Sequence, residues 1–219
     1  MKRETRSELQ KLAARCLLEI SGAAGQAGKA FFFAYNSAGE GATTTLCALG
    51  EHMGRSTGVK TLLVDGNLRT PSLHAFWGVD RSPGLVEACV SDLPVSSCAR
   101  GTRHRNVFVL PGGNPSEHLD ELFTAASFRR KVLEMKEGFQ LLLFDSAPLL
   151  EYNDTLAMAQ AMDGALLLAR SEFLPASVIM KSFELLKDLN VNILGSVLNR
   201  RKNYVPRFLR HMLRSPEET

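Results

Sequence analysis

Residues 31–45, with the sequence FFFAYNSAGEGATTT, decide how this chain folds. They begin as an apolar run, which is the pattern of a buried strand, and pass two glycines into a segment of small residues that suits a helix. A strand, a glycine-rich loop and a helix in this order form the context of a phosphate-binding loop. The backbone N–H groups of such a loop and of the helix N-terminus cradle phosphate oxygens. The stretch therefore predicts a phosphate site.

The lysine that normally follows the last glycine of such a loop is missing. The common pattern is G-x-x-x-x-G-K-[ST] or a shorter variant, and Ala42 stands at the lysine position, with no Lys or Arg between Lys29 and Arg55. Thr43 keeps a hydroxyl that would bind Mg²⁺, although it is equally suited to cap the helix. We expect ATP or ADP and Mg²⁺ to bind there with reduced affinity. The expected loop contacts are Gly39, Glu40, Gly41, Ala42, Thr43 and Thr44.

The composition is that of an ordinary globular protein. Of the 219 residues, 45% are apolar and 22% are charged, so we expect one large domain, or one domain with extensions. A net charge of +3 is too small to imply nucleic-acid binding by itself. The four cysteines show no CxxC spacing, which argues against a metal site or a disulfide framework. The N-terminus lacks the apolar core of a signal peptide, and no apolar run reaches the length of a membrane span, so the expected location is cytoplasmic.

The chain divides into three parts. Residues 1–28 contain an amphipathic helix at 4–20 and a linker rich in small residues, and this helix can pack on its own domain or on a neighbour. Residues 29–200 form the expected P-loop NTPase-like domain. Residues 201–219 are a basic tail with interleaved apolar side chains, which suits a solvated end or contact with the anionic inner face of a membrane. Nucleic-acid binding by the tail is a weaker alternative.

Apolar segments alternate with helical patterns along the middle part. Apolar strands that alternate with helices predict an α/β fold of three layers, in which a mostly parallel sheet is covered by helices on both faces. The region from Gly66 to Trp77 is predicted to be an irregular loop. The strands are expected at 31–35, 60–65, 106–110, 140–145, 164–169 and 191–198, and the helices from the glycine loop to about 54 and at 84–90, 116–136, 154–161 and 176–189.

Two of the predicted strands end in a carboxylate. Asp65 ends the strand that starts at Lys60, and Asp145 ends the strand that starts at Gln140. In parallel sheets of this kind, ligands bind at the carboxyl ends of the strands, where the glycine loop is also expected. A carboxylate that follows an apolar strand often holds Mg²⁺ in nucleotide hydrolases. We therefore expect Asp65 and Asp145 to be the catalytic residues, and Thr43 with Asp145 to be the metal ligands.

Four strings resemble motifs of the bacterial tyrosine kinases of capsule and exopolysaccharide synthesis, the BY-kinases. Residues 62–74 resemble their second acidic motif, and 111–117 resemble their G-x-x-P-P-N-P-S-E-L loop. Residues 144–148 resemble their I-D-T-P-P string, and 197–200 resemble their V-L-N-R string. The resemblance covers roughly residues 8–204 in order.

This resemblance implies a MinD/ParA-like P-loop fold and an Asp65 that is a candidate catalytic base. It also implies that Asn199 faces the adenine of a bound nucleotide. Members of the family work in the cytoplasm beside a membrane-spanning polysaccharide co-polymerase. They assemble into rings and phosphorylate a tyrosine cluster on neighbouring tails, so the resemblance also implies a homo-oligomer.

The chain departs from the family where the chemistry takes place. Besides the lost loop lysine, Asn67 stands where the family has its second acidic residue. Tyr204 stands alone in the tail, where the family has a tyrosine cluster. The assembly motif Glu-x-x-Arg-x-x-Arg is reduced to Glu8 and Lys11, with Ala14 at the position of the second arginine.

These departures lead to three hypotheses on function. The first is a degenerate BY-kinase homologue, without efficient phosphoryl transfer, that regulates or scaffolds exopolysaccharide synthesis by docking on a co-polymerase or on an active kinase paralogue. The second is a weak ATPase or kinase that recruits a cation from a neighbouring subunit. The third is a MinD/ParA-like positioning ATPase, which is disfavoured because Ser37 stands at the signature lysine of that class.

Overall fold

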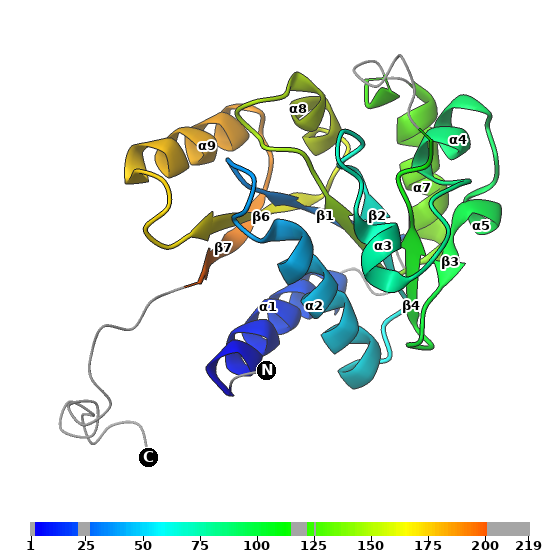
Figure 1. Cartoon of the computed structure of the whole chain (residues 1–219), viewed down its shortest axis with the longest axis horizontal. Helices are drawn as coiled ribbons and strands as arrows, with labels where there is room; N and C mark the ends of the chain where they lie inside the picture. The colour runs from blue at the N-terminus through cyan, green and yellow to red at the C-terminus, as the bar shows by residue number, and fades with distance from the viewer. Residues whose placement is uncertain (1–2, 22–26, 115–121, 125, 201–219) are drawn as a thin grey trace.

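The computed structural model describes residues 3–21, 27–114, 122–124 and 126–200 (Figure 1). In these residues one twisted sheet is covered by helices on both faces. The strands are β1 Lys29–Ala34, β2 Thr61–Asp65, β3 Arg100–Gly101, β4 Val107–Leu110, β5 Leu141–Asp145, β6 Gly164–Arg170 and β7 Ile193–Asn199. The helices are α1 Arg3–Ser21, α2 Ala42–Ser56, α3 Leu73–Trp77, α4 Leu85–Val90, α5 Val95–Cys98, α7 Ala126–Gly138, α8 Asn153–Ala159 and α9 Ala176–Asp188.

The described strands form a seven-stranded sheet in the order β3-β4-β2-β5-β1-β6-β7. Every neighbouring pair is parallel except β3 and β4, which run antiparallel. The loop after β1 therefore leaves the middle of the sheet, with β5 on one side and β6 on the other. This order brings the carboxyl ends of β2, β5, β1, β6 and β7 to one edge, which is where a ligand site is expected in such a sheet.

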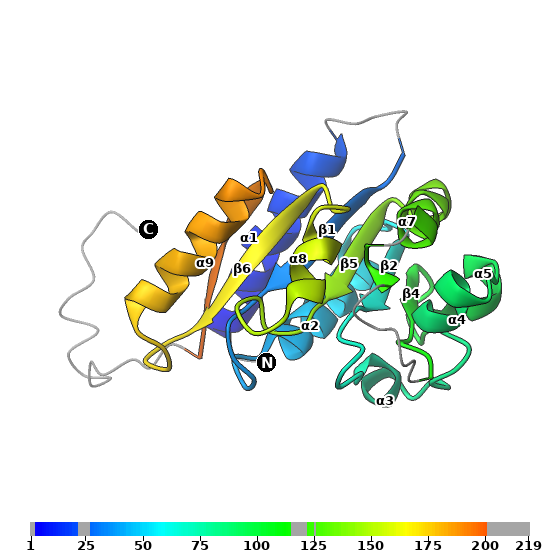
Figure 2. The same ribbon diagram turned by 90° about the horizontal axis from the view of Figure 1, so that it is seen from above.

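The side chains of β1 alternate between two fully packed faces. Phe31 and Phe33 enter a cluster with buried residues of α1 and α2, and Phe32 and Ala34 enter a second cluster with α4, α7 and α8. In Figure 1, α1 and α2 lie below the sheet and α8 and α9 lie above it, and Figure 2 shows the same layers from above. The central strands β1, β2, β5 and β6 are apolar and buried on both faces, which is the pattern of a parallel sheet. The predicted three-layer α/β fold is confirmed.

Helix α1 packs on the domain that follows it. Its buried residues Leu9, Ala13 and Cys16 join the same cluster as Leu46 and Met53 of α2. Of the two packing alternatives for this helix, packing on its own domain is therefore observed. None of the described helices combines the length and the apolar character that crossing a membrane requires.

The loop prediction for residues 66–77 was wrong in its second half. Leu73–Trp77 forms the short helix α3, because the carboxylate of Asp65 accepts hydrogen bonds from the amides of Ser72 and Leu73 at its start. This capping group lies several residues upstream, so local propensity did not reveal it. Helix α5 and the antiparallel strand β3 were also not predicted. The predicted start of a helix at residue 116 lies outside the described residues.

Candidate functional site

The glycine loop between β1 and α2 has the backbone shape of an anion cradle. Gly39 and Gly41 both have positive φ angles, 87° and 93°, which glycine adopts without steric cost. Gly41 is the N-cap of α2 and offers no side-chain hydrogen bond to the helix. The amides of residues 42–44 lie in the first turn of α2, so no carbonyl of the helix precedes them as a hydrogen-bond acceptor. The positive end of the helix dipole and these amides together suit a phosphate group.

Glu40 shapes the loop through its buried side chain. Its Oε1 accepts hydrogen bonds from the amides of Asn36 at 3.0 Å and Ser37 at 2.7 Å, and its Oε2 accepts one from the amide of Arg170 at 3.2 Å. These bonds tie the loop to its own entry and to the end of β6. Glu40 was predicted as a phosphate contact. In the structure its carboxylate accepts hydrogen bonds from amides of the loop and of β6.

Asn199, at the end of β7, also contacts the loop. Its Nδ2 donates a 2.8 Å hydrogen bond to the carbonyl of Glu40, and its Oδ1 accepts one from the amide of Arg200. A Cβ atom on Gly41 would lie 2.4 Å from this Nδ2, so a larger residue there would displace the Asn199 side chain. The residue expected to face adenine thus lies beside the predicted phosphate loop and holds its backbone.

Thr43 and Asp145 meet directly. The Thr43 hydroxyl donates a 2.6 Å hydrogen bond to Oδ2 of Asp145, and the amide of Ser146 donates to Oδ1. Thr43 was given two alternative roles, and its hydroxyl bonds to Asp145 and not to the helix start. Burial, together with the nearby charge of Asp65, raises the pKa of Asp145 to about 7, although the two hydrogen bonds act in the opposite direction.

Asp65 lies beside Asp145 in the sheet, in register across β2 and β5. Its Oδ2 accepts the amides that start α3, but its Oδ1 is buried and has no hydrogen-bond partner among the described residues. Burial raises the pKa of Asp65 to about 6, and the backbone hydrogen bonds lower it in part. A buried carboxylate oxygen without a partner is costly, so this atom is suited to bind a ligand.

These oxygens fit Mg²⁺, a hard cation that binds carboxylate, hydroxyl and phosphate oxygens. Thr43, Asp145 and Asp65 would hold it, and it would neutralise phosphate charge when bound. Among the described residues no group of three or more His, Cys, Asp or Glu side chains gathers as a metal site. Nucleotide oxygens and water would therefore have to complete the coordination shell.

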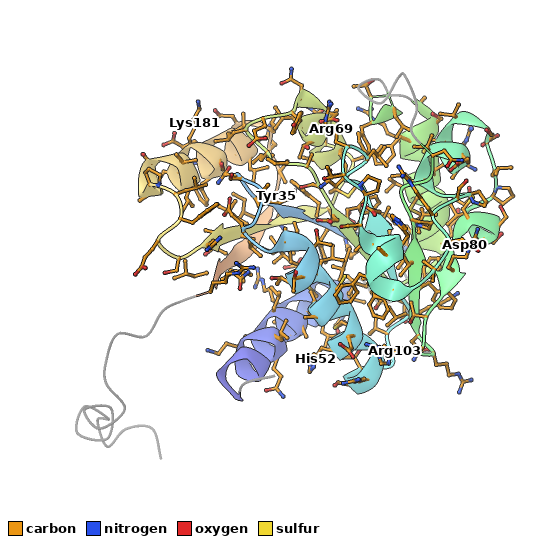
Figure 3. The ribbon with its side chains drawn as sticks, in the orientation of Figure 1. Tyr35, His52, Arg69, Asp80, Arg103 and Lys181 are labelled. Atoms are coloured by element: carbon orange, nitrogen blue, oxygen red, sulfur yellow. The ribbon has the colours of Figure 1, made fainter. Side chains whose placement is uncertain are left out.

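Ala42 and Asn67 are the two positions at which the resemblance to BY-kinases implies a missing charge. Ala42, at the missing lysine, is the first residue of α2 and is 4% exposed. Asn67, at the missing second carboxylate, donates from Nδ2 to the hydroxyl of Tyr35 at 3.4 Å. The Tyr35 side chain is buried at the start of the loop (Figure 3), and burial with the surrounding carboxylates raises its pKa.

Sequence reasoning missed two residues of this edge, Tyr35 and Arg170. Tyr35 directly follows β1, and its place at the carboxyl end of a strand could have identified it as a residue of this edge. Arg170 ends β6 and donates from Nη1 to the carbonyl of Gly39 at 3.4 Å. It ends an apolar strand, as Asp65 and Asp145 do, but only acidic strand ends were considered.

Known proteins that are similar in sequence include several bacterial tyrosine-protein kinases. No family model matches the chain. The chain is 24% identical over 164 residues to the tyrosine-protein kinase YwqD of Bacillus subtilis, a match that covers 75% of this chain and 69% of YwqD. It is 26% identical over 187 residues to the tyrosine-protein kinase ptk of Acinetobacter johnsonii, covering 84% of this chain and 23% of ptk. The chain therefore spans less than a quarter of that relative.

Solved structures share the fold. The chimerical protein CapA2B2 superposes with a TM-score of 0.76 at 22% identity, covering 84% of this chain and 81% of that one. The cell division ATPase MinD of Pyrococcus furiosus superposes with a TM-score of 0.70 at 26% identity, covering 84% and 78%. The shared fold confirms the predicted fold class, and the sequence similarity to YwqD and ptk confirms the resemblance to bacterial tyrosine kinases.

Proposed function

We propose, from its homology to bacterial tyrosine-protein kinases, that this chain is a degenerate BY-kinase-like protein. It regulates or scaffolds capsule or exopolysaccharide synthesis and carries out little or no phosphoryl transfer. The observation that carries this proposal is the loop itself. Its backbone cradle, Thr43 and Asp145 are assembled, while the buried first residue of α2 is Ala42, which brings no charge.

The missing ammonium group has a large effect on phosphoryl transfer. A transferring γ-phosphoryl group is stabilised by metal, lysine and backbone amides together. One ammonium at 3–4 Å from a phosphate oxygen is worth about 4 kcal/mol at an effective dielectric near 20. Losing even about 3 kcal/mol of this in the transition state slows the reaction by about two decades.

The second departure acts at the same centre. Asn67 provides an amide where the family has a carboxylate, and Mg²⁺ prefers carboxylate oxygens. The Asn67 amide donates to Tyr35. The two losses should therefore compound, because both weaken the neutralisation of the same phosphate group. The amides and the helix dipole remain, so weak binding of ATP or ADP, with weakened Mg²⁺ binding, is part of the proposal.

A regulator or scaffold of this kind acts by binding a partner protein and does not require ATP turnover. The partners we propose are a transmembrane polysaccharide co-polymerase, an active kinase paralogue, or further copies of this chain. We place the protein in the cytoplasm, with the basic segment 201–219 as a contact to the inner face of the membrane. Residues 29–200 are proposed as the nucleotide-binding unit that presents the docking surfaces.

The proposal is tested by titrating ATP and ADP with and without Mg²⁺ and then measuring ATP turnover and tyrosine autophosphorylation. We expect weak nucleotide binding, a small effect of Mg²⁺ and no turnover above background. Turnover that disappears in Asp145→Ala would refute the scaffold role, because it would show a working metal site. Asp188→Ala, on the exposed face of α9, is a matched control for loss of one carboxylate.

One observation favours an enzymatic alternative. Oδ1 of Asp65, which has no hydrogen-bond partner among the residues that the structure describes, and the Thr43–Asp145 pair provide the oxygens of a metal site. A weak ATPase or tyrosine autokinase could use this site with a cation from another subunit. The similarity to MinD favours a positioning ATPase as a further alternative, but Ser37 again lacks the lysine of that class. The turnover assay at several protein concentrations separates these alternatives, because a cation supplied by another subunit makes the specific activity rise with concentration.

A further inference from the structure

The side chain of Arg170 reaches the glycine loop from the neighbouring strand. Its Nη1 donates to the carbonyl of Gly39 at 3.4 Å. The position that a Cβ atom would take on Gly39 lies 3.9 Å from the same Nη1. The positively charged guanidinium group of Arg170 therefore lies directly against the loop.

The structure holds Arg170 in this place from three sides. Its amide donates to Oε2 of Glu40, the residue whose carboxylate also shapes the loop. Its guanidinium carbon lies 4.5 Å from the ring centroid of Phe173, a cation–π distance. In the sheet it is in register with Asn199, which binds the carbonyl of Glu40. Residues at the ends of β6 and β7 thus both form hydrogen bonds with the glycine loop.

This contact matters because the loop has no cation of its own. Between Lys29 and Arg55 the sequence contains neither Lys nor Arg. A guanidinium carries five N–H donors, and among the described residues Gly39 accepts from one of them. The remaining donors suit a phosphate oxygen, since Arg pairs with phosphate in a planar, bidentate manner.

We propose that Arg170 supplies in cis the positive charge that the loop lysine would carry, and that it binds a phosphate group of the nucleotide in the cradle. This inference rests on the proposed function, because it concerns the nucleotide that the degenerate site retains. It differs from charge recruitment between subunits, since the cation comes from the same chain.

The first test is an ADP titration of the full chain and three variants by calorimetry at low salt. Arg170→Gln is expected to weaken ADP binding about 10-fold, which is a typical effect of one charged phosphate contact. Arg170→Lys should keep most of the affinity because it keeps the charge. Lys181→Gln, on the exposed face of α9 (Figure 3), removes the same charge away from the loop and should leave the affinity unchanged.

The second test asks which part of the ligand Arg170 recognises. Pyrophosphate binding should fall in Arg170→Gln as ADP binding does, and adenosine binding should not change. Thermal denaturation of each variant without ligand shows whether Arg170→Gln is folded. If it is not, Arg170→Lys and Arg170→Met are compared instead, since both keep the aliphatic stem.

The third test combines Arg170 with a restored loop lysine. If both cations serve the same phosphate group, Arg170→Gln should cost less affinity in an Ala42→Lys chain than in the natural one. Equal ADP affinity in the natural chain and in Arg170→Gln would overturn the proposal, as would a natural chain that binds no ADP or pyrophosphate. Brisk autophosphorylation would instead refute the proposed scaffold function and leave the Arg170 result standing.

Discussion

The hydroxyl of Thr43 donates a 2.6 Å hydrogen bond to Oδ2 of Asp145, across a sequence separation of 102 residues. This bond joins the first turn of α2 to the carboxyl end of β5, so it holds the glycine loop against the two buried carboxylates. A metal ion in this site would be bound by the same two oxygen atoms. The strength of this hydrogen bond depends on whether Asp145 is ionised.

We predict that Thr43→Val destabilises the chain more at high pH than at low pH. At pH 8 the loss should be about 2 kcal/mol, because a hydrogen bond to a charged group is lost, and at pH 5 it should be about 1 kcal/mol. Urea denaturation at the two pH values measures this difference. Thr44→Val, at an exposed neighbouring position, is the matched control. Equal losses at both pH values would show that Asp145 does not change its charge between them.

The raised pKa values of the carboxylate pair predict a stability that falls as the pH rises. Asp145 titrates near 7 and Asp65 near 6 in the folded chain, against about 3.9 when unfolded. Between pH 4 and pH 7 the folded state therefore binds more protons, and its free energy of unfolding decreases with pH. From pH 5 to pH 8 the Asp145 contribution should be about 2–3 kcal/mol, since one pKa unit corresponds to about 1.4 kcal/mol.

Asp145→Asn provides the check on this pH dependence. It should be more stable than the natural chain at pH 8, because it removes a buried charge, and nearly equal at pH 5. Thermal denaturation from pH 5 to pH 8 measures both curves. Asp188→Asn, at an exposed position of α9, should follow the natural curve. A natural chain that becomes more stable with rising pH would contradict the assigned shifts.

The sheet was predictable from the sequence because its strands are apolar on both faces. Phe31, Phe32 and Phe33 form one unbroken apolar run, and the structure sends them alternately to two buried clusters. The positions of Thr43, Asp65 and Asp145 at one edge of the sheet were also predictable, because each follows a strand or a glycine turn, while their roles in binding and catalysis stay predictions.

The contacts of Arg170 and Tyr35 were not predictable in the same way. Arg170 meets Glu40 across 130 residues, because β6 lies directly beside β1. Alternation of strands and helices predicts a parallel sheet but does not give the order of its strands. The hydrogen bonds from the amides of Ser72 and Leu73 to Asp65 were not predictable either, because they depend on the path of the loop that connects these residues.

We predict that Gly41→Ala is more harmful than Gly58→Ala, although both glycines have positive φ angles, 93° and 70°. Gly58 has open space around it, so its substitution should cost only backbone strain of about 1 kcal/mol. At Gly41 the new Cβ would displace Asn199 and break its bond to Glu40, which adds about 1 kcal/mol.

A double-mutant comparison isolates this second contribution. In an Asn199→Ala chain, Gly41→Ala and Gly58→Ala should cost about the same, because the side chain that would clash is gone. Chemical denaturation of the six proteins gives the difference. A Gly41 effect that persists in the Asn199→Ala background would place the conflict elsewhere in the loop.

The last prediction concerns restoring the lost charges. Ala42→Lys with Asn67→Asp should tighten ADP binding in the presence of Mg²⁺ by about 10- to 100-fold, as expected for one regained ion pair and one regained carboxylate. The physical reason is that the amide cradle, Thr43 and Asp145 are already in place. Calorimetric titration with Mg-ADP measures the gain.

Two controls separate charge from size and from local packing. Ala42→Met with Asn67→Asp has a side chain of similar length without the ammonium group, so it should show little of the gain. Asn67→Asp alone replaces the group that donates to the Tyr35 hydroxyl with a carboxylate that can accept from it, and it should change affinity only when Mg²⁺ is present. If the lysine variant binds no better than the methionine variant, the first turn of α2 does not direct residue 42 toward phosphate. The weak nucleotide binding that we propose would then result from the backbone of the loop as well as from the missing charge.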